Sequence, residues 1–429
     1  MNYKEKNVKA GPFQYVNPAE DVIPVIAQFP WILRDNNVWI PPAARDFEWL
    51  AECGFNSAII LSTTVSDVQK AIELAGQVGI KCILEQYYHM DNEKMKTFVS
   101  NAEILKNLAG ILLKEEPKYS WIAADGQVME MYNWLISNNI NKMVFLCLAY
   151  SMAAEYVGPD AKDYGSYLST VQSRFNPPLW AYNYNPVITK GGSTYATLDS
   201  FYAALGDYAA IAKSTSTRFW AYCNCDSLVK SGHSRPAPSP GMLRLEAFSA
   251  LAFGAQGIVF RNYAQPVDTA DGSYVTAPVN RRRERTDLWY TVQSVISEIA
   301  RYSPVFLGCS MIEKKFMTQN ASGSGSPLLN MGGPVNALFV ESGKGALVTN
   351  ISNGGFNYMV IVSRDPFHSQ DIRILYKTGY LTKYETVEMT PNFMEDGLMA
   401  EPATGSQPTY TRALTLSPGG YAIIRWKMA

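Results

Sequence analysis

Two adjacent carboxylates, Glu115 and Glu116, directly follow an apolar run at residues 110–113 and one lysine, Lys114. Ionised groups avoid burial without partners, so a carboxylate pair at the end of a buried strand needs an explanation. Because a lysine does not easily face a dry helix layer, we expect Lys114 and Glu116 to point inward, with Glu116 nearest the open end. A partly desolvated Glu is a natural general acid, since burial raises its pKa towards neutrality. The simpler interpretation makes both Glu115 and Glu116 loop carboxylates.

Acid–base cleavage of a bond usually needs a second carboxylate, and two candidates follow other apolar runs. Asp226 closes the segment 219–226 (FWAYCNCD) and could act as nucleophile or as the base for a water. It could equally be a helix cap or a loop residue. Glu85 ends the run at residues 80–85 and ranks second, because it could instead pair with Lys114 on a neighbouring strand.

Amides, one arginine and many aromatic rings follow the same apolar runs. Amides bind hydroxyls well, and the flat faces of sugars stack on aromatic rings. An aromatic residue on a strand is more often core than ligand, so we expect about half of these rings to line a cleft. Arg261 could fix a carboxylate or bind an acidic sugar. The binding candidates are Glu115, Tyr87, Tyr88, Tyr150, Tyr182, Asn183, Tyr184, Trp220, Tyr222, Asn224 and Arg261.

The composition narrows the class of partner. The 429 residues include 37 basic and 38 acidic side chains, which gives a net charge of −1. No basic field exists to hold nucleic acid or an anionic membrane surface, so neither is expected as a partner. Only 17% of residues are charged, while 26 are tyrosines. Low charge with many rings suits a neutral ligand such as a carbohydrate.

Several other sites are excluded by spacing. The three histidines, His89, His233 and His368, stand at no metal-ligand spacing, and we expect neither a metal nor a cofactor. The six cysteines indicate buried thiols and no disulfide framework. No dinucleotide fingerprint or serine-hydrolase elbow occurs. No apolar run approaches the length of a membrane span, so we expect a soluble chain, of undetermined compartment and oligomeric state.

Between about residues 22 and 302, short apolar runs alternate with amphipathic helical stretches. Eight such units in this length predict a (β/α)8 barrel, whose catalytic groups lie at the carboxyl ends of its strands. We expect helices at 43–52, 67–78 with Ser66 as its N-cap, 92–108, 121–137, 164–175, 198–212, 242–255 and 285–301. The strand-like runs are 23–29, 56–61, 80–85, 110–116, 143–148, 179–183, 218–223 and 257–260.

Beyond Pro304 the pattern changes to short alternating runs separated by Gly-, Ser- and Pro-rich turns. This spacing predicts an antiparallel β-sandwich. We therefore expect a barrel domain at residues 1–310 and a sandwich domain at residues 325–429. The predicted strands are 337–339, 346–351, 357–362, 372–376, 381–384, 411–416 and 421–426.

The segment Glu115-Glu116-Pro117 resembles the Asn-Glu-Pro or Asp-Glu-Pro signature of clan A glycoside hydrolases. In that family the Glu at the end of the fourth strand is the acid/base, so the resemblance implies this role for Glu116. Other similar segments are Glu52–Asn56, Ala181–Pro186, Arg244–Tyr263 and the C-terminal pair Pro418–Tyr421 and Arg425–Trp426.

The main departure from the family lies on the seventh strand, where the nucleophilic Glu is missing and Asp226 is the only carboxylate. We therefore hold three functions open. The first is a glycoside hydrolase for O-glycosidic bonds of an oligo- or polysaccharide, with Glu116 as acid/base and Asp226, ahead of Glu85, as second carboxylate. The alternative is an inactive, glycan-binding barrel. A third possibility is a scaffold that assembles through the sandwich.

Overall fold

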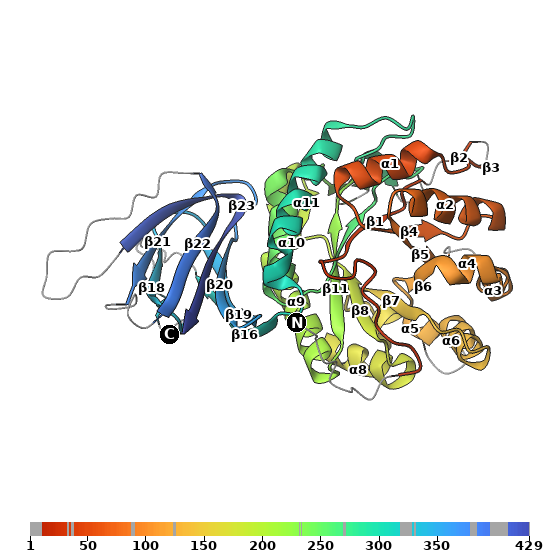
Figure 1. Cartoon of the computed structure of the whole chain (residues 1–429), viewed down its shortest axis with the longest axis horizontal. Coiled ribbons are helices and arrows are strands. Elements are labelled where there is room, and N and C mark those ends of the chain that lie inside the picture. The colour runs from red at the N-terminus through yellow and green to blue at the C-terminus, as the bar shows by residue number, and fades with distance from the viewer. Residues whose placement is uncertain are drawn as a thin grey trace, which may run out of the picture. The chain divides into compact units, whose positions relative to one another are not determined.

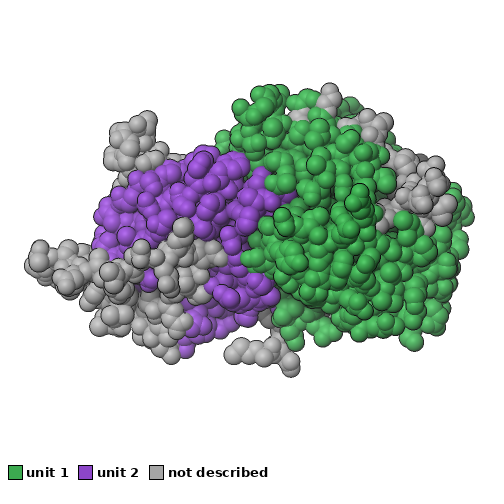
Figure 2. Space-filling model, turned by 90° about the horizontal axis from the view of Figure 1, so that it is seen from above, with its two compact units in different colours: residues 1–237, 255–296 green, residues 238–254, 297–429 purple. Residues whose placement is uncertain are grey.

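The structure is a computed structural model, and its two compact units are residues 1–237 with 255–296 and residues 238–254 with 297–429 (Figure 2). We expected a single domain boundary, between residues 310 and 325. In the structure, each unit instead consists of two separate segments of the chain. Among the described residues, no helix combines the length and apolar character that a membrane crossing requires. The described residues are 11–31, 34–35, 38–86, 91–122, 126–230, 232, 234–268, 272–317, 328–329, 332–377, 384–394 and 411–428.

The first unit contains a closed barrel of eight parallel strands in the order β1-β14-β11-β8-β7-β6-β5-β4 (Figure 1). Each strand coincides with one predicted apolar run, so the predicted fold class is confirmed. The strands are β1 (Val25–Gln28), β4 (Ser57–Leu61), β5 (Lys81–Glu85), β6 (Leu108–Glu115), β7 (Met143–Ala149), β8 (Leu179–Asn183), β11 (Arg218–Asn224) and β14 (Ile258–Arg261).

Helices separate the barrel strands along the chain, with two local differences from expectation. The predicted helix 92–108 is interrupted, because the Asn101 side chain caps a second helix by accepting from the amides of Glu103 and Ile104. Thr64, not Ser66, caps α2 through its bond from the Asp67 amide at 3.1 Å. The helices are α1 (Ala44–Cys53), α2 (Val65–Gln77), α3 (Asn92–Val99), α4 (Ala102–Asn107), α5 (Tyr119–Ile122), α6 (Gln127–Ser137), α7 (Ala154–Val157), α8 (Tyr164–Phe175), α9 (Leu198–Ser214), α10 (Pro240–Ala252) and α11 (Asp287–Phe306).

Apolar side chains fill the interior of the barrel. Such a packed interior leaves no pore, so polar chemistry is confined to the strand ends. The buried interior cluster comprises Ile26, Ile59, Ile83, Leu112, Met143, Phe145, Cys147, Leu179, Ala181, Trp220, Tyr222 and Val259.

A small five-stranded antiparallel sheet is built from the segments that follow β8, β11 and β14. Its strand order is β10-β9-β13-β12-β15. Because these segments leave the carboxyl ends of three barrel strands, the sheet lies at that end of the barrel. The strands are β9 (Val187–Lys190), β10 (Ser193–Ala196), β12 (Ser227–Lys230), β13 (Ser234–Arg235) and β15 (Gly272–Thr276); a separate hairpin joins β2 (Arg34–Asp35) to β3 (Val38–Trp39).

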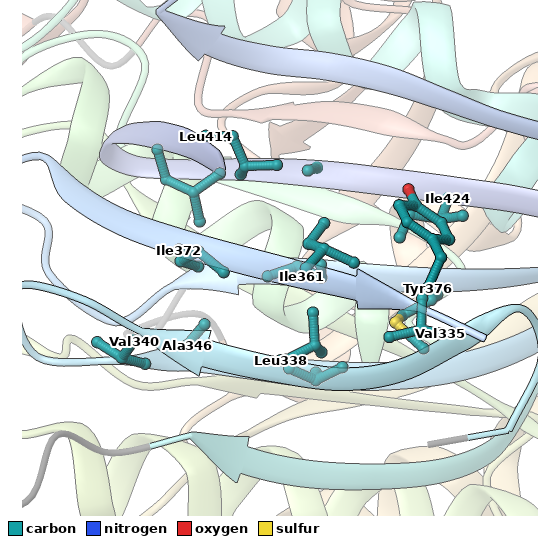
Figure 3. Packing of buried hydrophobic residues seen from close by; sticks show 14 of the residues in the cluster. Val335, Leu338, Val340, Ala346, Ile361, Ile372, Tyr376, Leu414 and Ile424 are labelled. Carbon is teal, nitrogen blue, oxygen red and sulfur yellow. The ribbon is translucent and has the colours of Figure 1, made fainter. Parts of the chain in front are cut away.

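The second unit is an eight-stranded antiparallel sheet. The first part of its long strand β23, at residues 411–416, pairs with β21, and the second part, at 421–426, pairs with β20. Apolar side chains from several strands pack together, as Figure 3 shows for Leu338, Ile361 and Ile424. The strands are β16 (Ser310–Met317), β17 (Leu328–Leu329), β18 (Val335–Val340), β19 (Ala346–Asn353), β20 (Phe356–Ser363), β21 (Gln370–Tyr376), β22 (Tyr384–Met394) and β23 (Thr411–Met428). The predicted strand 381–384 lies outside the described residues except for its last position.

Helix α10 packs within this second unit. The Phe248 ring stacks on Tyr421 of β23 with centroids 3.6 Å apart. Arg244 donates to both carboxylate oxygens of Glu298, with Nε at 3.0 and 3.1 Å. The sheet therefore completes its core with a helix that precedes it in the chain by some sixty residues.

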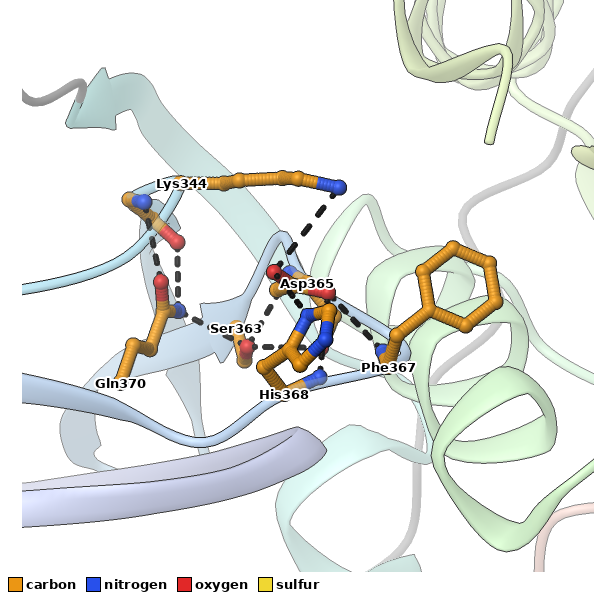
Figure 4. A network of polar contacts seen from close by, with 7 residues as sticks. Lys344, Ser363, Asp365, Phe367, His368 and Gln370 are labelled. Carbon is orange, nitrogen blue, oxygen red and sulfur yellow. Dashed lines mark hydrogen bonds and ion pairs between the residues drawn. The ribbon is translucent and has the colours of Figure 1, made fainter. Parts of the chain in front are cut away.

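The turn between β20 and β21 is held by a buried carboxylate, Asp365 (Figure 4). Asp365 accepts hydrogen bonds from the amides of Phe367 at 2.9 Å and His368 at 3.2 Å. Gln370 bonds both backbone groups of Gly345 on the neighbouring segment. These polar groups bond to one another and to the loop backbone, so we interpret the network as a structural support of the turn.

Candidate active site

Three carboxylates and one guanidinium meet at the carboxyl ends of the barrel strands. Glu85 is the last residue of β5, Glu115 the last of β6, Glu116 the next residue, and Arg261 the last of β14. They line a cavity of about 260 Å³, together with Gln86, Lys114, Lys118 and Tyr156. Four residues proposed from the sequence are thus brought to one place.

The inward phase expected for Lys114 is wrong, because β6 contains a bulge. Leu112 pairs with an interior residue of β7, but the register then shifts, and Glu115 pairs with the interior Cys147. A bulge inserts one extra residue and reverses the side that later side chains face. Glu115 therefore takes the inward position that alternation had given to Lys114.

Lys114 is accommodated by an aromatic ring. Its Nζ lies 5.0 Å from the centre of the Trp121 ring in α5, where a cation–π contact replaces part of the lost hydration. Burial lowers the pKa of Lys114, and the Glu85 carboxyl acts in the opposite direction. The Trp121 ring therefore allows a lysine to lie outside the barrel interior, contrary to expectation.

Glu115 forms an ion pair across the mouth of the barrel. Arg261 Nε lies 3.0 Å from Glu115 Oε1. Gln28, at the end of β1, donates from Nε2 to Glu85 Oε2 at 3.0 Å and to Glu115 Oε2 at 3.4 Å. These contacts tie the ends of four strands into one polar layer directly above the apolar interior.

The charged groups of this layer shift one another's pKa values. Burial raises the pKa of Glu85 well above its usual range, and the neighbouring Glu115 raises it further. Burial also raises the pKa of Glu115, while Arg261 opposes this shift. For Arg261, burial works against the charged form, but Glu115 and Glu116 outweigh it and raise the guanidinium pKa. Glu85 therefore keeps its proton to higher pH than an ordinary carboxyl does.

Glu116 is the most accessible of the three carboxylates, with 34% of its side chain exposed against 15% for Glu115. Asn183 Nδ2 donates to its Oε1 at 3.0 Å, and Arg261 Nη1 lies 3.8 Å from the same atom. The Glu116 backbone has φ 44°, in the left-handed region that non-glycine residues rarely adopt. Local strain of this kind concentrates at functional sites, where the surrounding structure maintains it.

Asp226 is fully buried, with 0% of its side chain exposed. Arg235 of β13 forms an ion pair with its Oδ1, and Asn262 Nδ2 donates to its Oδ2 at 2.7 Å. Asn224 is also buried. Neither residue is among those that line the cavity. The carboxylate proposed first as the partner of Glu116 is thus buried and ion-paired with Arg235.

Three of the proposed binding rings are core residues instead. Trp220 and Tyr222 belong to the buried interior of the barrel. The Tyr182 ring is buried and stacks on Tyr208 with centroids 4.3 Å apart. These rings alternate onto the inward or helix-facing side of their strands, where neighbouring side chains cover both faces.

The remaining rings differ in position. Tyr150 and Tyr184 are partly exposed and meet edge to face, with centroids 5.8 Å apart. The Tyr150 hydroxyl donates to Asp207 at 3.2 Å. Tyr87 and Tyr88 lie outside the described residues.

Sequence reasoning missed Gln28, Arg235 and Tyr156. The signal for Gln28 was present, because it is the one polar side chain in the first apolar run, at residues 23–29. Arg235 lies in a two-residue strand with no periodicity of its own, and Tyr156 in a one-turn helix. Within the described part of the chain, no three His, Cys, Asp or Glu side chains gather as they would around a metal ion.

No protein-family profile and no curated protein matches this sequence. Among solved structures, the GH42 β-galactosidase Gan42B is similar, with a TM-score of 0.56, 8% identity, and 96% of this chain and 99% of that chain covered. A catalytic mutant of Gan42B from G. stearothermophilus is similar with a TM-score of 0.55 and 8% identity, and the match covers 97% of this chain and 100% of that chain. A β-galactosidase from the psychrophilic Marinomonas ef1 has a TM-score of 0.46 and 8% identity. The match covers 66% of this chain and 60% of that chain. Similarity at this level of identity shows a glycosidase-like fold.

Proposed function

We propose that this glycosidase-like barrel is a glycoside hydrolase that cleaves O-glycosidic bonds of an oligo- or polysaccharide. One observation carries the proposal: Glu85, Glu115 and Glu116 converge with Arg261 on a cavity at the carboxyl ends of the barrel strands. In this fold, catalytic residues come from the ends of several different strands. Glycoside hydrolysis needs two carboxyl groups in different environments, and this cavity offers them.

We assign the two roles from those environments. Glu85 is buried beside Glu115, which raises its pKa, so it supplies the proton for the leaving oxygen. Glu116 is exposed to the cavity and is oriented by Asn183, so it activates the attacking water or attacks the sugar itself. Glu116 thus takes the base or nucleophile role in place of the acid/base role that its motif implied, and Glu85 takes the acid role and replaces Asp226 as its partner.

The remaining polar groups hold this pair in position. Arg261 fixes Glu115, and Gln28 connects Glu115 to Glu85. With Glu85 protonated, Glu115 contributes a second negative charge, beside that of Glu116, near the developing positive charge of an oxocarbenium-like transition state. The wild-type separation between the two reacting carboxyls determines whether the anomeric configuration is retained or inverted.

The test is a panel of linear glycans of differing sugar and linkage, incubated with the wild type, Glu116→Gln and Glu85→Gln. Glu73→Gln, an exposed carboxylate on α2, is the matched control. We expect the wild type and the control to release reducing sugar from one class of glycan. Each cavity variant should lose at least about 10²-fold in turnover while still binding that glycan. Full turnover by both cavity variants would refute the assignment.

A second candidate function is glycan binding without hydrolysis. It is favoured by the buried, ion-paired state of Asp226, which leaves the end of β11 without an accessible carboxylate among the residues that line the cavity. The same panel separates the two functions. Equal binding by wild type and Glu116→Gln, with no product from either, supports the binding protein.

A further inference from the structure

One face of the five-stranded sheet carries a row of side chains, with one residue from each strand. Tyr195 pairs with Ile188, and Leu228 pairs with both Arg235 and Tyr274. The pairing of Ser234 with Thr189 sets Arg235 opposite Ile188 and so connects the two halves. Directly paired residues point to the same side of a sheet. In strand order, the row is Tyr195, Ile188, Arg235, Leu228 and Tyr274.

This row faces the mouth of the barrel at two of its positions. The Arg235 guanidinium reaches Asp226, which follows the end of β11. Tyr274, at one end of the row, is close enough to Arg261 and Asp226 for their charges to act on its phenol group, whose pKa is raised chiefly by burial. The row therefore begins near Arg261, which lines the proposed catalytic cavity.

The other end of the row is open. Tyr195 leaves 41% of its surface exposed, which is unusual for an aromatic residue within a sheet. The opposite face of the sheet has a different character. Thr189 and Thr194 hydrogen-bond to each other there through their hydroxyls at 2.7 Å, beside Ser234. The two tyrosines are thus placed on the side that leads to the cavity.

We propose that this row is one wall of an elongated carbohydrate-binding cleft, with Tyr274 beside the cleavage point and Tyr195 stacking on a distant sugar unit. Strands in a sheet are about 4.8 Å apart, so the four steps from Tyr274 to Tyr195 span about 19 Å. A monosaccharide or disaccharide cannot contact both rings. The proposed hydrolase therefore selects oligosaccharides of several units, and this inference rests on the proposed function.

The experiment measures affinity against chain length. Ladders of β-1,4-linked galacto-, gluco- and manno-oligosaccharides, from monosaccharide to hexasaccharide, are titrated by calorimetry into the full-length Glu116→Gln protein, which binds without turnover. Tyr195→Ala and Tyr195→Phe are each added to this background. Thr194→Ala, on the same strand but the opposite face, is the matched control.

We expect affinity to rise with length in one ladder. Tyr195→Ala should weaken binding of the longest sugars about tenfold and leave the disaccharide unchanged. Tyr195→Phe and Thr194→Ala should behave like the parent protein. If affinity is independent of length, or if Tyr195→Ala binds the hexasaccharide like its parent, the elongated cleft is refuted while the hydrolase stands. If no ladder is bound or hydrolysed by the wild type, both proposals fall.

Discussion

Arg261 Nε lies 3.0 Å from Glu115 Oε1, and the two residues stand on opposite strands of the closed barrel. Strands β11, β8 and β7 separate β14 from β6 in one direction, and β1, β4 and β5 separate them in the other. The ion pair therefore spans the mouth along a diameter. It closes the barrel from above and leaves the neighbouring Glu116 at the edge of the cavity.

Replacing Arg261 should destabilise the barrel more than replacing both partners. Arg261→Met leaves the largely buried Glu115 carboxylate unpaired, which costs about 3 kcal/mol. The double variant Arg261→Met with Glu115→Gln removes the buried charge and should recover much of that loss. Urea unfolding followed by tryptophan fluorescence measures both. Equal losses in the single and double variants would contradict a direct pair.

The left-handed backbone conformation at Glu116 should lower the stability of the protein, independently of the chemical role of its carboxylate. Glycine adopts φ 44° without the penalty of about 1 kcal/mol that a side chain incurs. We therefore expect Glu116→Gly to be about 1 kcal/mol more stable than Glu116→Gln, although both are inactive. Thermal unfolding of the two variants gives the comparison. A glycine variant that unfolds below the glutamine variant would exclude this strain.

The buried Glu85 should make stability fall as pH rises. Its folded-state pKa lies above the unfolded value, so its contribution is complete below about pH 4.5 and is lost as pH climbs through the raised pKa. The slope for one proton cannot exceed about 1.4 kcal/mol per pH unit. Glu85→Gln should lack this component. Unfolding free energies of both proteins from pH 4 upward would show it as a widening difference, and parallel curves would contradict it.

Asp226→Asn separates a supporting residue from a catalytic one. The variant leaves Arg235 largely buried without its carboxylate, so we expect a loss of about 3 kcal/mol in stability. Turnover per folded molecule should fall by less than the roughly 10²-fold loss expected for an acid–base residue. Intact stability with abolished turnover would restore Asp226 as the second carboxylate.

Much of the fold was predictable because buried strands and half-buried helices have recognisable patterns of apolar residues. Apolar runs such as 179–183 are followed by long amphipathic helices, and this alternation leaves few topologies open. The site was harder to predict. Glu116 stood out by its motif, but the bulge that turns Glu115 inward depends on how β6 fits β7, which no local pattern records. The role of Arg235 could not be predicted for the same reason, since it depends on a tertiary contact with Asp226.

Rings at strand ends were predicted less well. Trp220 and Tyr182 lie near strand ends, where an aromatic ring could be exposed to bind a sugar, yet neighbouring side chains bury both rings. Tyr195, the most exposed ring of the five-stranded sheet, lies in a Ser- and Thr-rich segment that reads as a loop. Composition indicated that aromatic residues matter here but not which ones are accessible.

The packing of α10 has a consequence for any attempt to produce the second unit by itself. The sheet stacks Tyr421 on Phe248 of α10, and Arg244 of the same helix forms an ion pair with Glu298 of α11. A chain that stopped before Ser297 would expose these groups to water. The strands of the second unit therefore form a complete core only together with α10, and a substitution at Phe248 alters the surface on which Tyr421 packs.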